Sequence, residues 1–443
     1  MPLALALVLG SLSGCGKERE KNGIAVLDAG GDTLAVLQSA DDLSKSSFSA
    51  YLEIALLETA EILSRQENTT VQEALDSLFD RQLRVETAFD RNVYEAVTGT
   101  QAVTQSDLEM GIAIVDQLGN LLAAYSSDPV INFAIQKNAP YSAFKPLSVY
   151  LPAIASGQVT WFTRYEDSPY KQLPGEDGAL QDWPRNSDDT YSMAQVPVYA
   201  ALKDSLNTVA VKCLSQMGVM NSITFLQDNL GIPLKQEEQA AKALGEEEVI
   251  GNVALGYLES GVSPVDMAGY YQIFGTGGRY TKPCAVTRLE EDSGAVLYER
   301  KIEYKEVTTP EAADVMNRLL QEVVVSGTGT GARLEETQVA GKTGTGDDHG
   351  GNWFVGLIPG YSCAVWHGKA EGNQAANIFG AVMKQVFAGS EKKRSEFSAF
   401  STLHWEICCA ESGMPIGDGC SIIKEAYFIT DYVGQPCNIH NKK

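Results

Sequence analysis

Positive charge is scarce in this chain. Lysine and arginine number 34 against 57 aspartates and glutamates, which gives a formal net charge of −23. A nucleic-acid-binding protein needs a surface rich in lysine and arginine to meet the phosphates, so this balance argues against a nucleic-acid partner. Histidine is also rare, with four residues, and none has the spacing of a metal ligand set. We therefore expect neither a metal nor an organic cofactor.

Cysteine is too rare for a disulfide scaffold, with eight residues in 443. Three cysteines stand in apolar surroundings and are expected to be buried thiols: Cys213, Cys284 and Cys363. Four gather near the C-terminus, where an exported protein could pair them: Cys408, Cys409, Cys420 and Cys437. A zinc site that includes His440 is the alternative, but the spacing is poor, so no metal site is predicted.

The sequence also has no apolar run long enough to cross a bilayer at its start. The run from Leu3 to Leu12 falls short of the roughly 20 residues required, but it suits the core of a signal peptide. The residues 12–15, LSGC, resemble a bacterial lipobox, in which Cys15 becomes the lipidated N-terminus; an ordinary signal peptide is the alternative. We interpret residues 1–20 as signal peptide, lipobox and tether, and expect an extracytoplasmic, lipid-anchored protein. No Lys or Arg precedes the run, which suggests a truncated start.

The front of the chain, residues 21–108, shows no cluster of acidic or basic residues suited to chemistry. Residues 23–38 read as a β-hairpin around Gly30-Gly31. Apolar spacing of three and four predicts a helix over 47–65, and a threonine cap with an acidic first turn opens a second helix after it. We interpret this region as a scaffold or linker.

The pattern changes at residue 109, where two alternating apolar runs flank the turn 117–120. Three further strands are predicted in the stretch 337–368, with helices between the two groups. The helical segments fall near 196–217, 220–229, 264–275 and 372–388. A sheet made from both ends with helices from the middle gives an α/β (α+β) domain over 109–390, an antiparallel sheet flanked by helices. Residues 391–443 form a cysteine-containing C-terminal extension.

Ser142 and Lys145 lie three residues apart at the mouth of a predicted helix, so their side chains share a face. A serine hydroxyl is a poor nucleophile unless a neighbour takes its proton. A lysine can do so if burial, or another cation nearby, lowers its pKa. The pair alone is weak, because a helix cap followed by a lysine is common.

Two further motifs follow at long intervals. Ser205-Leu206-Asn207 stands before an apolar helix, and Lys342-Thr343-Gly344-Thr345 ends a strand. Each has an ordinary interpretation, as a helix cap or as a charged edge strand. A glycine close behind a strand lysine also suits close approach by a ligand backbone.

The order S-x-x-K, S-x-N, K-T-G is typical of β-lactamases and penicillin-binding proteins. Over roughly residues 82–443 the chain resembles the transpeptidase domain of class A penicillin-binding proteins. The segments 182–207, 252–283 and 352–368 are similar to the longer signatures of that family, and the tail is similar to the C-terminal extension of some members. The resemblance implies a β-lactamase/transpeptidase-like fold in which an all-helical part holds the S-x-N motif.

The resemblance also implies roles for these residues. Ser142 attacks the penultimate D-alanine carbonyl of a peptidoglycan stem peptide and forms an acyl-enzyme, and β-lactam antibiotics bind to it covalently. Lys145 is the base, although the assignment of the base is disputed in this superfamily. Ser205 passes a proton toward the leaving amine, and Asn207 holds the substrate amide.

The K-T-G segment receives the remaining implied roles. Lys342 tunes Ser205 and attracts the substrate carboxylate, which Thr343 and Thr345 also bind, with Gly344 between them. The backbone N–H groups of Ser142 and Thr345 form the oxyanion hole.

Two departures from the family stand out. Tyr141 precedes the nucleophile where a small residue is more usual, which narrows the site. Residues 21–81 are too short for the usual glycosyltransferase domain, so we expect a D,D-transpeptidase without polymerase activity. Three alternatives stay open: a serine β-lactamase or sensor, disfavoured by the lack of its glutamate loop motif; a D,D-carboxypeptidase with the same residues; and a catalytically inactive cell-wall scaffold.

Overall fold

The computed structural model describes residues 23–175, 178–346, 351–368, 372, 374–390, 393–430 and 434–440. The expected signal peptide and tether at 1–20, with the lipidated Cys15, lie outside the described residues. Within the described ranges no single helix is long and apolar enough to cross a membrane. Helices α8 (Asn207–Met217) and α9 (Val219–Leu230) meet that criterion only as a pair bent by 86°.

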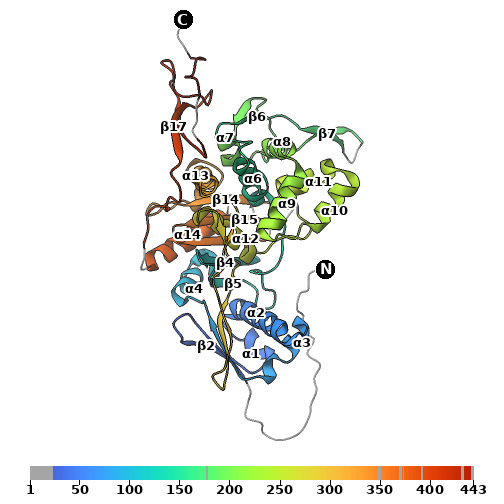
Figure 1. The fold of residues 1–443 in the computed structure, drawn as a ribbon, viewed down its shortest axis with the longest axis vertical. Helices are drawn as coiled ribbons and strands as arrows, with labels where there is room; N and C mark the ends of the chain where they lie inside the picture. Colours follow the sequence, from blue (N-terminus) through green and yellow to red (C-terminus); the bar gives the residue numbers. More distant parts are fainter. Residues whose placement is uncertain are drawn as a thin grey trace.

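A five-stranded antiparallel sheet lies at the centre of the molecule (Figure 1). Its order is β14-β15-β16-β4-β5, so strands from both ends of the predicted domain pair with each other. The strands are β4 (Met110–Asp116), β5 (Leu121–Ser126), β14 (Ala340–Thr345), β15 (Asn352–Ile358) and β16 (Tyr361–His367). The predicted α/β (α+β) class, with an antiparallel sheet and flanking helices, is confirmed.

Helices cover both faces of this sheet. Successive residues of a strand face opposite sides of the sheet. Gly341 and Gly344 of β14 are three residues apart, so a Cβ at each would point to a different face. A Cβ at Gly344 would lie 2.5 Å from the Pro140 carbonyl oxygen. A Cβ at Gly341 would meet the ring of Phe354, which packs on Phe379 of the closing helix α14. The segment around residue 140 and α14 (Gln374–Gly389) therefore lie on opposite faces.

The chain between β5 and β14 contains the helices of the predicted helical part, together with several short strands. Its helices are α6 (Leu151–Ala155), α7 (Val198–Lys203), α8, α9, α10 (Lys235–Leu244), α11 (Glu246–Leu255), α12 (Pro264–Tyr271) and α13 (Pro310–Ser326). The helix predicted over 196–217 is interrupted at Ser205, whose φ of 61° does not fit a right-handed helix. The hydroxyl of Tyr271 in α12 donates to the Ala143 carbonyl at 2.6 Å, which ties this part to the face that Pro140 contacts.

A second sheet occupies the N-terminal end, in the order β12-β11-β3-β1-β2. Its strands are β1 (Ile24–Leu27), β2 (Thr33–Leu37), β3 (Leu83–Thr87), β11 (Val286–Glu291) and β12 (Val296–Glu299). The helices beside it are α1 (Ala40–Ser44), α2 (Ser49–Glu67) and α3 (Val71–Asp76), whereas α4 (Arg91–Thr98) and α5 (Gln101–Thr104) pack on α14 of the central sheet. The hairpin over 23–38 and the helix over 47–65 are confirmed, and Thr70 caps α3 as predicted.

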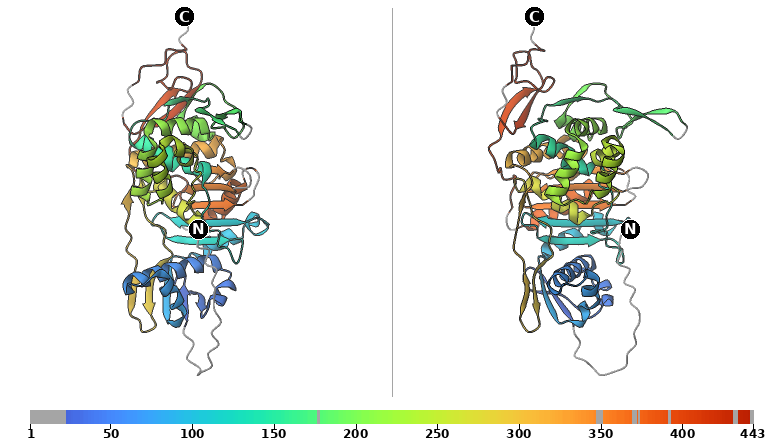
Figure 2. Two further views of the ribbon diagram at one scale, coloured as in Figure 1. Left: turned by 90° about the vertical axis from the view of Figure 1, so that its right-hand side faces the viewer. Right: turned by 45° about the vertical axis from the view of Figure 1, so that its right-hand side comes forward.

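The β11–β12 hairpin comes from inside the segment 109–390 and completes the sheet of the front section (Figure 2). Glu58 of α2 fastens it, because its carboxylate accepts the backbone N–H groups of Ala285 at 2.7 Å and Val286 at 3.1 Å. The two parts therefore share a sheet that the linear order of the sequence does not indicate.

The C-terminal extension projects from the body as a hairpin (Figure 1). Its strands are β17 (His404–Cys409) and β18 (Ile423–Phe428). Smaller pairs elsewhere are β6 (Arg164–Glu166) with β9 (Gln195–Pro197), β7 (Lys171–Pro174) with β8 (Leu180–Trp183), and β10 (Arg279–Tyr280) with β13 (Lys305–Glu306). The seven described cysteines are free thiols, and the predicted burial of Cys213, Cys284 and Cys363 is confirmed.

Candidate active site

Ser142 lies in a 3₁₀ turn, η2 (Tyr141–Phe144), that leads into a π-helical segment, η3 (Pro146–Tyr150), and then α6. The predicted helix is therefore present but irregular. Pro146 has no N–H to donate to the Ser142 carbonyl in the α-helical pattern. The N–H of Lys145 donates to that carbonyl instead. Side chains at i and i+3 eclipse in a 3₁₀ helix, so Ser142 and Lys145 are expected on the same side of this turn.

Lys145 is fully buried and reaches the S-x-N motif. Its Nζ lies 2.8 Å from the carbonyl oxygen of Ser205, 2.6 Å from Oδ1 of Asn207 and 3.4 Å from Oγ of Ser205. Burial, together with the positive charge of Lys342, lowers the pKa of Lys145 well below its ordinary value. Both effects favour the neutral amine, which is the form that can accept a proton.

Lys342 approaches Ser205 from the sheet. Its Nζ donates to Oγ of Ser205 at 2.9 Å and contacts the carbonyl and hydroxyl oxygens of Thr343 at 3.0 and 3.2 Å. Burial lowers the pKa of Lys342 to about 7. One hydroxyl, that of Ser205, therefore lies between two buried amines, which is an arrangement suited to proton transfer.

The strand β14 carries the rest of the K-T-G segment past the nucleophile. The Thr343 hydroxyl shares a 2.7 Å hydrogen bond with that of Thr328. Gly344 permits the close approach, since a Cβ there would lie 3.1 Å from the backbone nitrogen of Ala143. Thr345, the last residue of the strand, is exposed. The structure thus brings Thr343, Gly344 and Thr345 alongside the turn that bears Ser142.

Two residues that the motifs did not single out hold the S-x-N segment in place. The N-cap position of α8 is Leu206, which offers no side-chain acceptor. Asn186 supplies one instead: its Oδ1 accepts the N–H of Asn207 at 2.9 Å and that of Thr208 at 3.4 Å. The Nδ2 of Asn186 donates to the buried carboxylate of Asp167 at 2.8 Å. The only sequence signal was the resemblance of the segment 182–207 to a family signature.

Asp167 is the anchor of this network. It also accepts the Thr208 hydroxyl at 2.6 Å and the Ser192 N–H at 2.8 Å. Burial acts to raise the pKa of Asp167, but the hydrogen bonds from Thr208, Ser192 and Asn186 outweigh it and lower the pKa. A charged carboxylate therefore orients Asn186, which in turn orients the first turn of α8.

Tyr141 occupies a strained position beside the nucleophile. Its φ of 49° is unusual for a bulky residue. Its ring makes an edge contact with Tyr257, with the centroids 5.5 Å apart. The ring also lies over Gly346, where a Cβ would come within 2.6 Å of it. The side chain thus packs at the end of β14.

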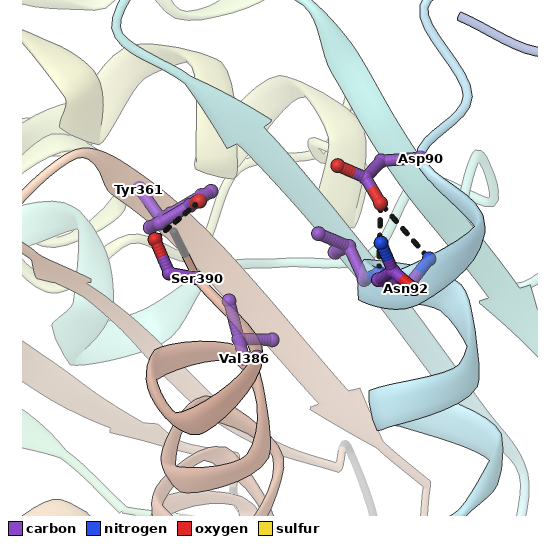
Figure 3. A pocket seen from close by; sticks show the side chains of 7 residues that line it. Asp90, Asn92, Tyr361, Val386 and Ser390 are labelled. Atoms are coloured by element: carbon purple, nitrogen blue, oxygen red, sulfur yellow. Dashed lines mark hydrogen bonds between the residues drawn. The ribbon is translucent and has the colours of Figure 1, made fainter. Parts of the chain in front are cut away.

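A separate pocket of about 320 Å³ lies on the other face of the sheet (Figure 3). It lies between α4, the start of β16 and the end of α14, and its walls include Asp90, Asn92 and Val386. Two of its polar groups are already engaged: Asp90 caps α4, and the Tyr361 hydroxyl donates to Ser390 at 3.2 Å. This pocket holds none of the S-x-x-K, S-x-N or K-T-G residues.

Comparison with known proteins identifies the family of this chain. The family described as penicillin binding protein transpeptidase domain matches residues 104–384, more than half of the chain. The chain belongs to this family. Penicillin-binding protein 1A of Clostridium botulinum is 38% identical over 256 residues, which covers 55% of this chain and 30% of the relative. Penicillin-binding protein 1A of Clostridium tetani is 29% identical over 386 residues, or 80% of this chain and 48% of the relative.

The chain therefore spans about a third to a half of the length of these curated relatives. Among solved structures, the D,D-transpeptidase domain of a peptidoglycan glycosyltransferase from Eggerthella lenta has a TM-score of 0.63 at 16% identity, covering 83% of this chain and 99% of that chain. The PonA1 protein from Mycobacterium tuberculosis in complex with penicillin V also has a TM-score of 0.63, at 20% identity over 79% of this chain and 96% of that chain. The predicted β-lactamase/transpeptidase-like fold of this penicillin-binding protein family is confirmed.

Proposed function

We propose that this chain is a serine D,D-transpeptidase that cross-links peptidoglycan stem peptides through an acyl-enzyme on Ser142, and that β-lactams acylate the same serine. The observation that carries the proposal is the chain of contacts from Lys145 through the Ser205 hydroxyl to Lys342, with Ser142 one 3₁₀ turn before Lys145. Both lysines are buried and have lowered pKa values. Membership of the penicillin binding protein transpeptidase family supports the same reaction class.

The first step is proton removal from Ser142 by Lys145. A neutral amine has two N–H donors, and two acceptors without a proton to give, the Ser205 carbonyl and Asn207 Oδ1, engage Nζ of Lys145. The lone pair is then available to the hydroxyl of Ser142, which precedes Lys145 by one 3₁₀ turn. The serine oxygen forms a bond to the penultimate D-alanine carbonyl carbon as its proton passes to Lys145.

The carbonyl oxygen becomes an oxyanion in the tetrahedral intermediate. The backbone N–H groups of Ser142 and Thr345 are the proposed donors, since β14 runs beside η2; such donors contribute about 10²–10³ in rate each. The intermediate collapses with cleavage of the C–N bond. Ser205 gives its proton to the leaving D-alanine amine and is reprotonated from Lys145, with Lys342 holding the hydroxyl.

The substrate carboxylate is held by the end of β14. Lys342 supplies positive charge when protonated, and the hydroxyls of Thr343 and exposed Thr345 supply donors. The ester on Ser142 is then attacked by the amine of a second stem peptide, which forms the cross-link and restores the serine. With a β-lactam the same attack opens the ring, and no leaving group departs. Such substrates place the protein at the cell wall, outside the cytoplasm, with Cys15 as a lipid anchor.

Labelling with fluorescent penicillin tests the acyl-enzyme. The unaltered chain should carry a stable label, Ser142→Ala should carry none, and the exposed-serine control Ser187→Ala should label normally. Lys145→Ala should abolish acylation while the circular dichroism spectrum is unchanged. Absence of labelling in the unaltered, folded chain would refute the proposal and favour an inactive scaffold, and rapid turnover of a chromogenic cephalosporin would point to a β-lactamase.

A second assay separates transpeptidation from carboxypeptidation, because the same residues serve both. A pentapeptide donor is incubated with and without an acceptor amine, and the products are resolved by mass spectrometry. The proposal predicts the amine adduct as the main product when the acceptor is present. A tetrapeptide acid as the main product at all acceptor concentrations would assign a D,D-carboxypeptidase instead.

A further inference from the structure

The C-terminal extension brings three thiols and one imidazole to a single point. The sulfurs of Cys409, Cys420 and Cys437 and a ring nitrogen of His440 all lie within 4.8 Å of one another. Cys409 ends β17, Cys420 precedes β18, and Cys437 and His440 share the last turn of the described chain. The spacing along the sequence, 409, 420, 437 and 440, is irregular, so the grouping emerges only when the hairpin closes.

The distances match tetrahedral zinc coordination. The Nδ1 atom of His440 lies 3.5 Å from the sulfur of Cys409, 3.6 Å from that of Cys420 and 3.5 Å from that of Cys437. Zinc bonds of about 2.3 Å to sulfur and 2.0–2.1 Å to nitrogen at tetrahedral angles put ligand nitrogen and sulfur about 3.5 Å apart. A disulfide could join only two of the sulfurs and would leave the third thiol and the imidazole without a common role.

The surroundings of the four groups also suit a metal centre. The other ring nitrogen of His440, Nε2, lies 2.7 Å from a carboxylate oxygen of Glu411, the carboxylate–histidine arrangement that orients an imidazole on zinc. The backbone N–H groups of Ser412 and Gly417 point at the sulfurs of Cys409 and Cys420, at 3.5 and 3.3 Å. Such N–H donors stabilise thiolate ligands.

Two glycines allow the last turn to close on the loop between the strands. A Cβ at Gly417 would overlap the carbonyl oxygen of Cys437, and one at Gly419 would overlap that of His440. The backbone of Cys437 is further held by a 2.8 Å hydrogen bond to the Pro415 carbonyl. Chain segments that pack this closely hold the four ligands in place.

The extension needs such a cross-link, because its own core is small. Several of its large apolar side chains are exposed: Trp405, Ile416, Ile422, Ile423 and Ile439. The buried apolar residues among the described residues beyond 400 are Cys408, Cys409, Ala426, Phe428 and Cys437. A two-stranded hairpin is marginal by itself, and small units that lack a core commonly use metals or disulfides.

We propose that Cys409, Cys420, Cys437 and His440 bind one Zn²⁺ as a closed structural site. Four protein ligands leave no open position for water, so the ion fixes the extension and takes no part in acyl transfer. Binding requires three thiolates and a neutral imidazole, and the thiol protons are released to solvent as the zinc–sulfur bonds form. Cys408 is excluded, because its side chain points to the opposite face of β17 and joins the apolar core.

Metal analysis of the full chain tests the site. The protein is produced with zinc in the medium, purified without chelator, and its metals are measured by inductively coupled plasma mass spectrometry. We expect about one zinc per chain in the unaltered protein, and less than about a tenth of that in Cys420→Ser and His440→Ala. The control Cys408→Ala alters the adjacent cysteine and should keep its zinc. Iron in place of zinc, or no metal, would overturn the proposal.

Two further measurements cover the case in which a ligand variant fails to fold. His440→Cys offers a fourth sulfur and should retain the metal; after replacement by Co²⁺, its visible spectrum should shift relative to that of the unaltered protein. Peptide mapping without reductant should find Cys409, Cys420 and Cys437 as metal-protected thiols. Purified protein that lacks zinc and carries a disulfide between two of these three cysteines would contradict the proposed zinc site.

Discussion

Replacement of Asn186 by alanine should weaken both the fold and the chemistry, because this side chain links a buried carboxylate to the S-x-N motif. Its Oδ1 is the acceptor for the first N–H groups of α8, at Asn207 and Thr208. Loss of a helix cap costs about 0.5–2 kcal/mol. Its Nδ2 also donates to the carboxylate of Asp167, and the loss of a hydrogen bond to a charged group costs about 1.5–3 kcal/mol.

The two contributions together predict a loss of about 2–5 kcal/mol in the free energy of unfolding. The acylation rate should fall further than the loss of folded protein explains. Asn207 would lose its fixed position, and with it the 2.6 Å contact that orients Nζ of Lys145. A displacement of about 1 Å in such a contact can lower a rate by about 10²-fold.

Urea unfolding followed by circular dichroism measures the first effect, and the second-order rate of penicillin acylation, corrected for the folded fraction, measures the second. Asn92→Ala is the matched control, an exposed asparagine on α4, and should change stability by no more than about 0.5 kcal/mol. An Asn186→Ala protein with unchanged stability and normal acylation would refute the idea that this side chain positions the motif.

Three other perturbations follow from the structure. Burial lowers the pKa of Lys342 to about 7, so its positive charge is lost as the pH rises above that value. The rate of acylation by penicillins, which carry a carboxylate, should therefore decline above about pH 7. A rate that stays constant to about pH 9 would show that the charge of Lys342 does not contribute to penicillin binding. Gly344→Ala should nearly abolish acylation in a folded chain, because the added Cβ would sit 2.5 Å from the Pro140 carbonyl oxygen; normal labelling would contradict this. Glu58→Ala removes the acceptor of the Ala285 N–H, which should lower the free energy of unfolding by about 1–3 kcal/mol. The folded fraction should still be acylated normally. Unchanged stability by calorimetry, or a loss of penicillin labelling in folded protein, would contradict this.

The sequence predicted the core of this domain well, because its signals are local. Alternating apolar runs place β4 and β5, and the strands around Lys342 follow the same pattern. Helical spacing predicts α2 and α14. The structure brings Lys145, Ser205 and Lys342, one residue from each motif, within hydrogen-bonding reach of one another through the Ser205 hydroxyl.

The features that the sequence did not reveal depend on contacts between residues far apart in the chain. Asn186 caps a helix that begins 21 positions later, so no local cap pattern can indicate it. The β11–β12 hairpin joins β3 across about 200 residues. The grouping of Cys409, Cys420, Cys437 and His440 requires the tail hairpin to form first. The irregular helix after Ser142 comes from Pro146, whose missing N–H alters the hydrogen bonds of the turn.

The most direct test of the account is the mass of the chain after incubation with benzylpenicillin. Intact mass spectrometry of the unaltered protein should show the addition of one whole penicillin molecule, and digestion should place it on the peptide that contains Ser142. Ser142→Ala should keep its original mass under the same conditions. An adduct on another residue, or an unmodified folded protein at saturating penicillin, would contradict the assignment of Ser142 as the nucleophile.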